Sequence, residues 1–366
     1  MTQRSEKDPL DLGHLRERID AVDGRLLDLL AERADLVAGI AEAKRQGGLS
    51  TVDPERENLL LRKVLERGAG RFPREAIVAV FRAIMSASVS LQATVSVAYL
   101  GPAGTFSHFA ARTLFGYAPR YVETGTIEGV FDAVRSGRAD YGVVPFENST
   151  EGSVAAAVEG LLAGGVFIRR EVVLPIHHCL MGRASSLSEV ERVYSHPQGL
   201  AQCRDWLHRN VPRAQLVQTD STAAAAREAR RDAAGTAIGS SVAAEIHGLE
   251  ILADSIQDQA ENETRFVMIG KERAKPTGDD KTTLAFAIED EESRGSLRRT
   301  LALIDEAGVN MTRIESRPRR SDAWRYLFVV DVEGHADDAP VADAITRLES
   351  SCDFVHVLGS YPRYPR

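Results

Sequence analysis

Residues 9–46 read PLDLGHLRERIDAVDGRLLDLLAERADLVAGIAEAKRQ, and the pattern in this segment governs the fold of the N-terminal part of the chain. Leucine, isoleucine and valine recur every three or four positions, which predicts one unbroken amphipathic helix. At 1.5 Å per residue this helix would span roughly 55 Å, longer than a compact small domain. Two shorter helices follow, and they cannot cover its apolar side alone. We therefore predict an all-α three-helix domain that pairs with a second copy as an intertwined dimer.

Proline and glycine positions predict the helix boundaries in this domain. Aspartate-proline pairs at 8–9 and 53–54 are typical helix starts, and Pro73 predicts a third start. Glycines at 47–48 and within 68–70 predict the ends of the first two helices. The third helix is expected to reach Thr94, so that the first domain covers residues 1–94.

The second segment, residues 95–271, alternates short β-rich runs with helical runs, which is typical of an α/β domain with mostly parallel strands. Its length favours two lobes with a cleft between them. The predicted strands are 95–100, 141–145, 172–176, 192–194, 237–239 and 266–269. The predicted helices are 107–115, 127–136, 154–163, 199–209 and 222–231.

A polar linker at 272–280 leads into a third segment, 280–366. The order of its predicted elements is strand, helix, strand, strand, helix, strand, which is a ferredoxin-like βαββαβ unit. These elements are expected at 282–288, 295–307, 309–315, 327–332, 340–350 and 354–359.

The composition narrows the function classes. The formal net charge of −8 over 366 residues argues against nucleic acid or a membrane surface as a partner. Cys179, Cys203 and Cys352 are widely separated and lack metal-ligand spacing, so we expect neither a metal site nor disulfides. No apolar signal segment opens the chain, and a cytoplasmic location is expected.

Cationic residues on the first helix suggest a site for a small dianion. Arg33 and Lys44 are eleven positions apart and therefore lie within about 20° on one helix face. Arg16 lies about 26 Å from Arg33 along the axis. One small molecule could contact Arg33 and Lys44 of one copy together with Arg16 of an antiparallel second copy.

The complete polar set resembles the site of the all-helical type of chorismate mutase, whose pattern is Arg, Arg, Lys, then Asp-x-x-Arg-Glu, then Ser-x-x-x-Gln. The matching positions here are Arg16, Arg33, Lys44, Asp53, Arg56, Glu57, Ser88 and Gln92. The resemblance implies that chorismate rearranges to prephenate by a pericyclic step without nucleophile or cofactor, so that catalysis reduces to positioning and electrostatics. It also implies a role for each residue: Arg16 of the second copy and Arg33 hold carboxylates, Lys44 and Gln92 approach the ether oxygen, Glu57 and Asp53 bind the ring hydroxyl region, and Arg56 and Ser88 complete the pocket.

Four polar strings in the second segment lie at predicted strand ends, where open α/β sheets bind ligands. They are GPAGTFSH at 101–108, PFENSTEGS at 145–153, YSHPQ at 194–198 and TRF at 264–266. Each string alone is an ordinary turn or helix cap. Together with DSTAAA at 220–225, and in this order, they resemble prephenate dehydratase.

That resemblance implies loss of water and carbon dioxide from prephenate to give phenylpyruvate. It makes Thr264 the leading candidate to donate a hydrogen bond to the departing hydroxyl, with His178 as the next candidate. The other implied pocket residues are Glu147, Asn148, Ser149, Ser195, Gln202, Ser221 and Thr222. Arg265 is interpreted either as a carboxylate partner or as structural. Because adjacent residues of a strand alternate faces, His177 and His178 are not both expected to face the cleft.

The third segment resembles an ACT domain of the phenylalanine-binding kind. Its ESRP motif is intact at Glu315, Ser316, Arg317 and Pro318, and the motif usually written GALV is Gly295, Ser296, Leu297 and Arg298 here. The resemblance implies a dimer that binds phenylalanine between copies and is inhibited by it.

The combined prediction is a bifunctional enzyme of phenylalanine biosynthesis that needs no cofactor and acts on chorismate and prephenate as a homodimer or higher homo-oligomer. Two alternatives stay open on the residues alone. One is a monofunctional dehydratase whose helical arm only dimerises the protein, and the other is a non-catalytic amino-acid sensor. Measuring turnover of chorismate and prephenate distinguishes all three.

Overall fold

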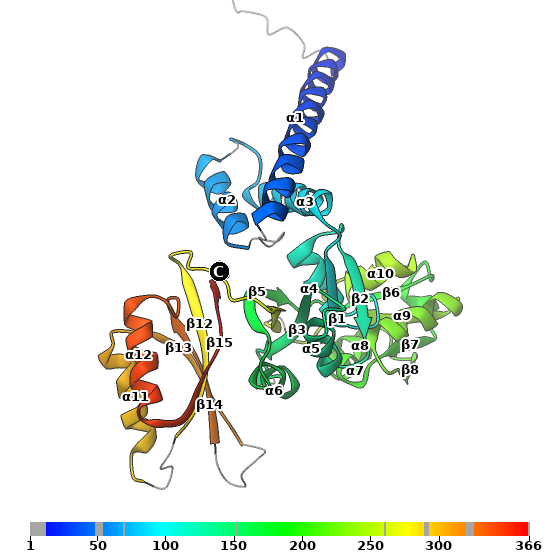
Figure 1. Cartoon of the computed structure of the whole chain (residues 1–366). Coiled ribbons are helices and arrows are strands. Elements are labelled where there is room, and N and C mark those ends of the chain that lie inside the picture. Colours follow the sequence, from blue (N-terminus) through cyan, green and yellow to red (C-terminus); the bar gives the residue numbers. More distant parts are fainter. Residues whose placement is uncertain are drawn as a thin grey trace, which may run out of the picture.

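The computed structural model describes residues 12–47, 54–68, 70–150, 152–259, 261–288, 293–318 and 326–364. Three units follow one another along the chain: a helical domain, a two-lobed α/β domain and a C-terminal α/β domain (Figure 1). The predicted three-domain architecture is therefore confirmed. The predicted first helix start at 8–9 and the candidate Asp53 lie outside the described residues. Within the described ranges, no helix has the length and apolar character needed to cross a membrane.

The helical domain consists of α1 (Leu12–Gly47), α2 (Pro54–Arg67) and α3 (Arg74–Gln92). α1 projects away from the other domains in Figure 1 and buries only Val37 and Ala41, where it crosses α3. Its apolar side is otherwise open: Ile19 is 59% exposed, and Leu26 is 52% exposed. Such a long uncovered apolar stripe is unfavourable in water and favours association with another apolar surface.

The first lobe of the central domain is a sheet in the order β2 (Arg120–Thr124), β1 (Ser96–Leu100), β3 (Tyr141–Asn148), β11 (Glu263–Gly270) and β5 (Phe167–Pro175), with β4 (Gly152–Ser153) paired to β3. Its helices are α4 (Phe106–Phe115), α5 (Ile127–Arg135) and α6 (Ala155–Leu162). Hydroxyl caps set two helix starts, since Thr105 and Thr126 each accept a hydrogen bond from a first-turn N–H group.

The second lobe is a sheet in the order β10 (Glu250–Ala253), β6 (Cys179–Gly182), β9 (Gly235–Gly239), β7 (Arg192–Ser195) and β8 (Gln215–Gln218). Its helices are α7 (Pro197–Gln202), α8 (Arg204–Asn210), α9 (Thr222–Arg231) and α10 (Ser241–His247), with a short 3-10 turn at Leu187–Glu189. The chain crosses between the lobes twice, once after β5 and once before β11. The two crossings lie side by side, because the backbone N–H of Ile176 donates to the carbonyl of Asn262 at 2.7 Å.

The prediction of mostly parallel strands is wrong for this domain. β1, β2 and β3 pair in parallel, as do β7, β8 and β9, but β11 runs antiparallel to both β3 and β5 and β6 runs antiparallel to both β9 and β10. β6 follows the first crossing between the lobes, and β11 follows the second. Each therefore enters its sheet in the direction opposite to the neighbouring strands that belong to local strand-helix-strand units. Five strands of this domain were not predicted. The exposed, mixed sequences of β2, β8 and β10 give weak β patterns, and β4 and β6 are only two and four residues long.

The C-terminal domain has the predicted βαββαβ order. Its elements are β12 (Asp280–Ile288), α11 (Ser296–Glu306), β13 (Met311–Pro318), β14 (Tyr326–Glu333), α12 (Ala339–Glu349) and β15 (Cys352–Pro362). The antiparallel sheet has the order β13-β14-β12-β15, which leaves β13 at one edge. One sheet face packs on α11 and α12 through Leu284, Phe286 and Val330.

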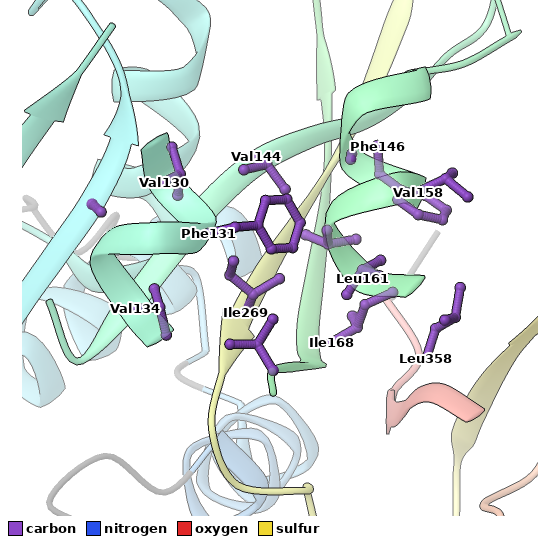
Figure 2. Packing of buried hydrophobic residues seen from close by; sticks show 14 of the residues in the cluster. Val130, Phe131, Val134, Val144, Phe146, Val158, Leu161, Ile168, Ile269 and Leu358 are labelled. Atoms are coloured by element: carbon purple, nitrogen blue, oxygen red, sulfur yellow. The ribbon is translucent and has the colours of Figure 1, made fainter. Parts of the chain in front are cut away.

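The other face of this sheet packs on the first lobe of the central domain. Leu358 of β15 lies beside Ile168 of β5, and both belong to one apolar cluster around Phe131 (Figure 2). The approach is close: a Cβ atom on Gly359 would lie 2.3 Å from the carbonyl oxygen of Ile168. The third and second domains therefore share a continuous core.

This close approach predicts that Gly359→Ala destabilises the protein. The added methyl group must push β15 away from β5, and overpacking of this kind costs about 1–3 kcal/mol. Chemical denaturation should show a lower free energy of unfolding for Gly359→Ala. The control is Gly125→Ala, since a Cβ at Gly125 meets no atom within 4 Å. Equal stability of the two variants would contradict the packing described here.

Candidate functional site

Three of the residues predicted for the helical site come together between α1 and α3. Arg33 donates to the hydroxyl of Ser88, and this hydroxyl donates to the carbonyl of Ile84 at 2.6 Å. Gln92 donates from Nε2 to the carbonyl of Ser88 at 3.2 Å, while its Oε1 is buried with no hydrogen-bond partner among the described residues. A buried amide with unused capacity is expected to meet a ligand or water.

Lys44 belongs to the same side of α1. Arg33, Val37, Ala41 and Lys44 follow the i, i+4, i+8, i+11 spacing of one helix face, and this is the face that packs on α3. Lys44 is half-buried. Arg16 is exposed on a distant part of α1, so it is not close to this cluster within one chain.

The second helix places its candidates differently. Arg56 is exposed, and Glu57 forms an ion pair with Arg170 of β5 at 2.9 Å. The Glu57 side chain is 18% exposed and that of Arg170 10%. Glu57 thus lies at the boundary between the helical and central domains. Arg170 was not predicted, because an arginine inside a strand gives no motif.

In the first lobe, Thr264 opens β11 opposite the end of β3. Asn148 donates from Nδ2 to the Thr264 hydroxyl at 2.9 Å and to Asn262 Oδ1 at 3.0 Å. The backbone N–H of Thr150 donates to Asn148 Oδ1 at 2.9 Å, which fixes the orientation of the amide group. Because Asn148 donates to the Thr264 oxygen, the hydroxyl proton of Thr264 points elsewhere and can be donated.

Ser149 forms hydrogen bonds that hold the loop beside Asn148 and Thr264. Its backbone N–H donates to the carbonyl of Glu263 at 2.9 Å, and its hydroxyl accepts from the N–H of Glu263 at 3.0 Å. These bonds hold the end of β3 against the start of β11. Ser149 therefore acts on the geometry of Asn148 and Thr264.

His178 lies on the first crossing between the lobes. Its Nε2 is 2.8 Å from Gln202 Oε1, which only accepts, so Nε2 carries the proton. Nδ1 is then an acceptor, and it is buried with no hydrogen-bond partner among the described residues. Burial lowers the pKa of His178, although the hydrogen bond that its Nε2 donates to Gln202 opposes this shift. A neutral histidine of this kind is a poor proton donor.

His177 and His178 face opposite ways, as the strand period predicts, with His177 exposed and His178 buried. His196 caps α7, since its Nδ1 accepts from the N–H of Gln198 at 3.3 Å. Neither His177 nor His196 shares the buried setting of His178.

Several candidates of the second lobe act as caps or inner supports. Ser195 is fully buried and donates to the carbonyl of Ile238 at 3.1 Å. The Ser221 hydroxyl accepts from the N–H of Ala224 at 3.0 Å and caps α9, in which Thr222 is the first residue.

The loop at 101–108 joins the lobes. Ser240 donates to the carbonyl of Gly104 at 2.8 Å, and a Cβ at Gly104 would lie 3.2 Å from Ala243. The ring of Phe106 meets His178 edge to face at 5.5 Å. The string at 101–108 thus reaches the buried His178 through Phe106, and His178 contacts Gln202 of α7.

Arg265 and Glu147 link the central domain to the C-terminal domain. Arg265 pairs with Glu171 at 2.7 Å, with Asp331 of β14 at 2.6 Å and with Glu147 at 3.3 Å. Burial lowers the pKa of Arg265, but Tyr361, Asp331 and Glu171 outweigh it and raise the pKa well above its usual value. Arg265 was interpreted either as a partner of the substrate carboxylate or as a structural residue. Its buried ion pairs support the structural role.

Glu147 also accepts a hydrogen bond from Arg313 Nε of β13 at 2.8 Å. Arg313 in turn contacts Glu315 and the hydroxyl of Ser153. Glu315 and Arg317 share the sheet face with Arg313, while Ser316 and Pro318 lie on the opposite face. Arg313 was not predicted, although its position two residues before Glu315 was a usable signal.

Gly295 precedes α11 in a left-handed conformation with φ of 79°, which favours glycine. Ser296 is the first residue of α11, and Leu297 packs on the C-terminal core. Arg298 is exposed.

The chain matches three protein-family models: chorismate mutase type II at residues 15–93, prephenate dehydratase at 97–274 and the ACT domain at 291–350. A bifunctional chorismate mutase/prephenate dehydratase of Aquifex aeolicus is 44% identical, over 96% of this chain and 98% of that protein. One of Neisseria gonorrhoeae is 40% identical over 95% and 96%. A solved prephenate dehydratase of Arthrobacter aurescens in complex with L-Phe is 36% identical, covers 74% of this chain and 90% of that chain, and has a TM-score of 0.67.

The setting of His178 predicts a pH-dependent stability. Its folded pKa is lowered, so below about pH 6.5 the unfolded chain binds this proton more readily than the folded protein. The contribution of neutral His178 is complete above that pH and declines as the pH falls toward the folded pKa. Urea unfolding at about pH 7.5 and about pH 5.5 should show a larger loss for the wild type than for His178→Gln. The same loss in both proteins would contradict burial of His178.

Proposed function

The chain belongs to the family of bifunctional chorismate mutase/prephenate dehydratases, and from this premise we propose how its residues carry the two reactions. Chorismate is rearranged to prephenate in the helical domain. Prephenate then loses water and carbon dioxide in the central domain and becomes phenylpyruvate. We further propose domain boundaries at 1–94, 95–271 and 280–366, cytoplasmic location, and phenylalanine as the regulatory ligand of the C-terminal domain.

For the mutase, the observation that carries the proposal is the Arg33–Ser88–Gln92 cluster between α1 and α3. Arg33 binds one substrate carboxylate, for which a planar guanidinium is suited. One N–H of Gln92 is engaged by Ser88 and the other donates, with Lys44, to the ether oxygen as its bond breaks. These charges stabilise the transition state more than the substrate, because negative charge on that oxygen grows during the step.

We propose that this site is completed by a second copy of the chain. The support is the exposed apolar stripe of α1, which includes Ile19 and Leu26, and the distance of Arg16 from Arg33 within one chain. In an antiparallel pair, Arg16 of each copy would bind the second carboxylate in the other copy's site. Asp53 and Glu57 are assigned to the ring hydroxyl side, with the ion pair to Arg170 holding Glu57, and Arg56 and Ser88 complete the pocket.

For the dehydratase, we assign to Thr264 a hydrogen bond to the departing hydroxyl group of prephenate. The carbon–carbon bond to the ring carboxylate breaks, its electron pair enters the ring, and the C–O bond of the hydroxyl breaks, which makes the ring aromatic. The hydroxide leaves as water after taking a proton from solvent, since a threonine hydroxyl is a poor acid. Asn148 orients Thr264, while Ser149, Ser195, Gln202, Ser221 and Thr222 form or support the pocket walls.

For regulation, we propose that phenylalanine binds at Gly295, Ser296 and Leu297 together with the ESRP residues 315–318. Glu315 contacts Arg313, and Arg313 bonds Glu147, the neighbour of Asn148 in β3. A ligand that draws Glu315 or Arg317 toward itself would change this contact. Glu147 is accordingly assigned to the domain boundary and not to substrate.

Lys44→Ala is expected to lower mutase turnover by about 10²–10³ or more, as loss of a charge-stabilising donor does. Dehydratase turnover of added prephenate should be unchanged, because Lys44 is not among the residues assigned to the dehydratase site. Lys63→Ala on the exposed side of α2 is the matched control. Mutase activity at the wild-type rate in Lys44→Ala would remove Lys44 from the site.

Thr264→Val keeps the shape of the side chain but removes the hydroxyl. Dehydratase kcat is expected to fall by about 10²–10³, while Thr264→Ser should keep most of it because the donor remains. Circular dichroism of both variants checks the fold. If Thr264→Val turned over prephenate as fast as wild type, the assignment would fail.

Phenylalanine is expected to slow the dehydratase of the wild-type protein and to have a weaker effect on Glu315→Gln and Arg317→Met. The reason is that both side chains lie on the strand that faces the central domain. Dehydratase rates are measured with and without phenylalanine, with Arg347→Met on α12 as the control. A wild-type enzyme indifferent to phenylalanine would contradict the regulatory proposal.

A further inference from the structure

A cavity of about 210 Å³ lies between α3 of the helical domain and α4 and β5 of the central domain. One water molecule needs about 10–15 Å³ of cavity volume, so this cavity has room for a molecule that carries one ring. Three guanidinium groups line it, those of Arg82, Arg112 and Arg170. Its apolar walls include Met85, Val89, Leu114 and Met268.

The three arginines differ in how far their charges are neutralised. Arg112 pairs with Glu245 at 3.1 Å, and Arg170 pairs with Glu57 at 2.9 Å. Arg82 has no such carboxylate among the described ion pairs, and its Nε is buried without a hydrogen-bond partner there. Burial and the charge of Arg170 lower the pKa of Arg82, and a hydrogen bond with Tyr364 and the charge of Glu57 only partly oppose this shift. An anion between the guanidinium groups of Arg82 and Arg170 would therefore be stabilised.

This cavity adjoins the proposed mutase site on α3. Val89 lines the cavity and Ser88 belongs to the Arg33 cluster, and consecutive residues of a helix point about 100° apart. Glu57, which is assigned to the mutase site, also lines the cavity.

We propose that this cavity binds a small carboxylate with an apolar ring, held by Arg82 and Arg170. Buried guanidinium groups select a carboxylate, and the methionine, valine and leucine walls select an apolar body. The ligand class follows from these lining residues. We assign the physiological ligand to the substrates and products of the two reactions, and this assignment rests on the proposed function.

The test uses the full chain with ¹³C-labelled methionine methyl groups and 3-phenylpropionate as the probe. Met85 and Met268 line the cavity, while the buried Met181 in the second lobe serves as an internal reference. Saturable shifts of the Met85 methyl signal are expected, and 3-phenylpropanol, which lacks the carboxylate, should not produce them. Arg82→Gln should weaken the affinity at least about tenfold, as loss of a charged hydrogen bond does.

Arg74→Gln, an exposed position on the same helix, is the matched control and should bind the probe like wild type. Both mutase and dehydratase rates are measured on the same samples, and Arg82→Gln should keep them. An unresponsive Met85 signal, or equal affinity in wild type and Arg82→Gln, would overturn the proposal. A wild-type protein without mutase or dehydratase activity would contradict the proposed function. The shifts of the Met85 signal would still show whether the cavity binds the probe.

Discussion

The arrangement of the central and C-terminal domains depends on one buried guanidinium group, that of Arg265. A buried charge is costly unless its partners replace the water it loses. Glu171 of the central domain and Asp331 and Tyr361 of the C-terminal domain provide these partners. Because each domain contributes only part of the set, separating the domains would leave charges buried and unpaired. Arg265 is also adjacent to Thr264, so the group that joins the domains lies next to the proposed dehydratase donor.

We infer from this adjacency that the C-terminal domain acts on the proposed dehydratase site through direct contacts. Glu315, Arg313 and Glu147 form a chain of charged contacts that ends one residue from Asn148. Regulation requires two states with different affinities for the ligand, and a charge chain that can exchange partners supplies such states. The helical domain is attached through fewer polar contacts, chiefly Glu57–Arg170 and Arg62–Asp279. We infer tighter coupling between the second and third domains than between the first and second.

Periodicity and motif order were sufficient to predict the three domains, the long first helix and the βαββαβ order. The resemblance to the chorismate mutase site placed Arg33, Ser88 and Gln92 in one site, and the structure brings these three residues together. Helix geometry alone related only Ser88 to Gln92, since Arg33 lies on a different helix. Strand directions near the lobe crossings were not predictable, since they depend on long-range pairing of β11. The roles of Glu147 and Arg170 were also hidden, because an ion pair between domains leaves no local pattern. A neutral His178 could be recognised only once its burial and its contact with Gln202 were known.

We infer that Arg265 couples the position of the C-terminal domain to the position of the Thr264 hydroxyl. The most direct measurement compares wild type with Arg265→Lys, which keeps the charge but loses the planar fork that contacts several partners at once. We expect Arg265→Lys to have a lower dehydratase kcat and a weaker response to phenylalanine, with an unchanged mutase rate. A folded Arg265→Lys protein with wild-type dehydratase kcat and full phenylalanine inhibition would contradict it.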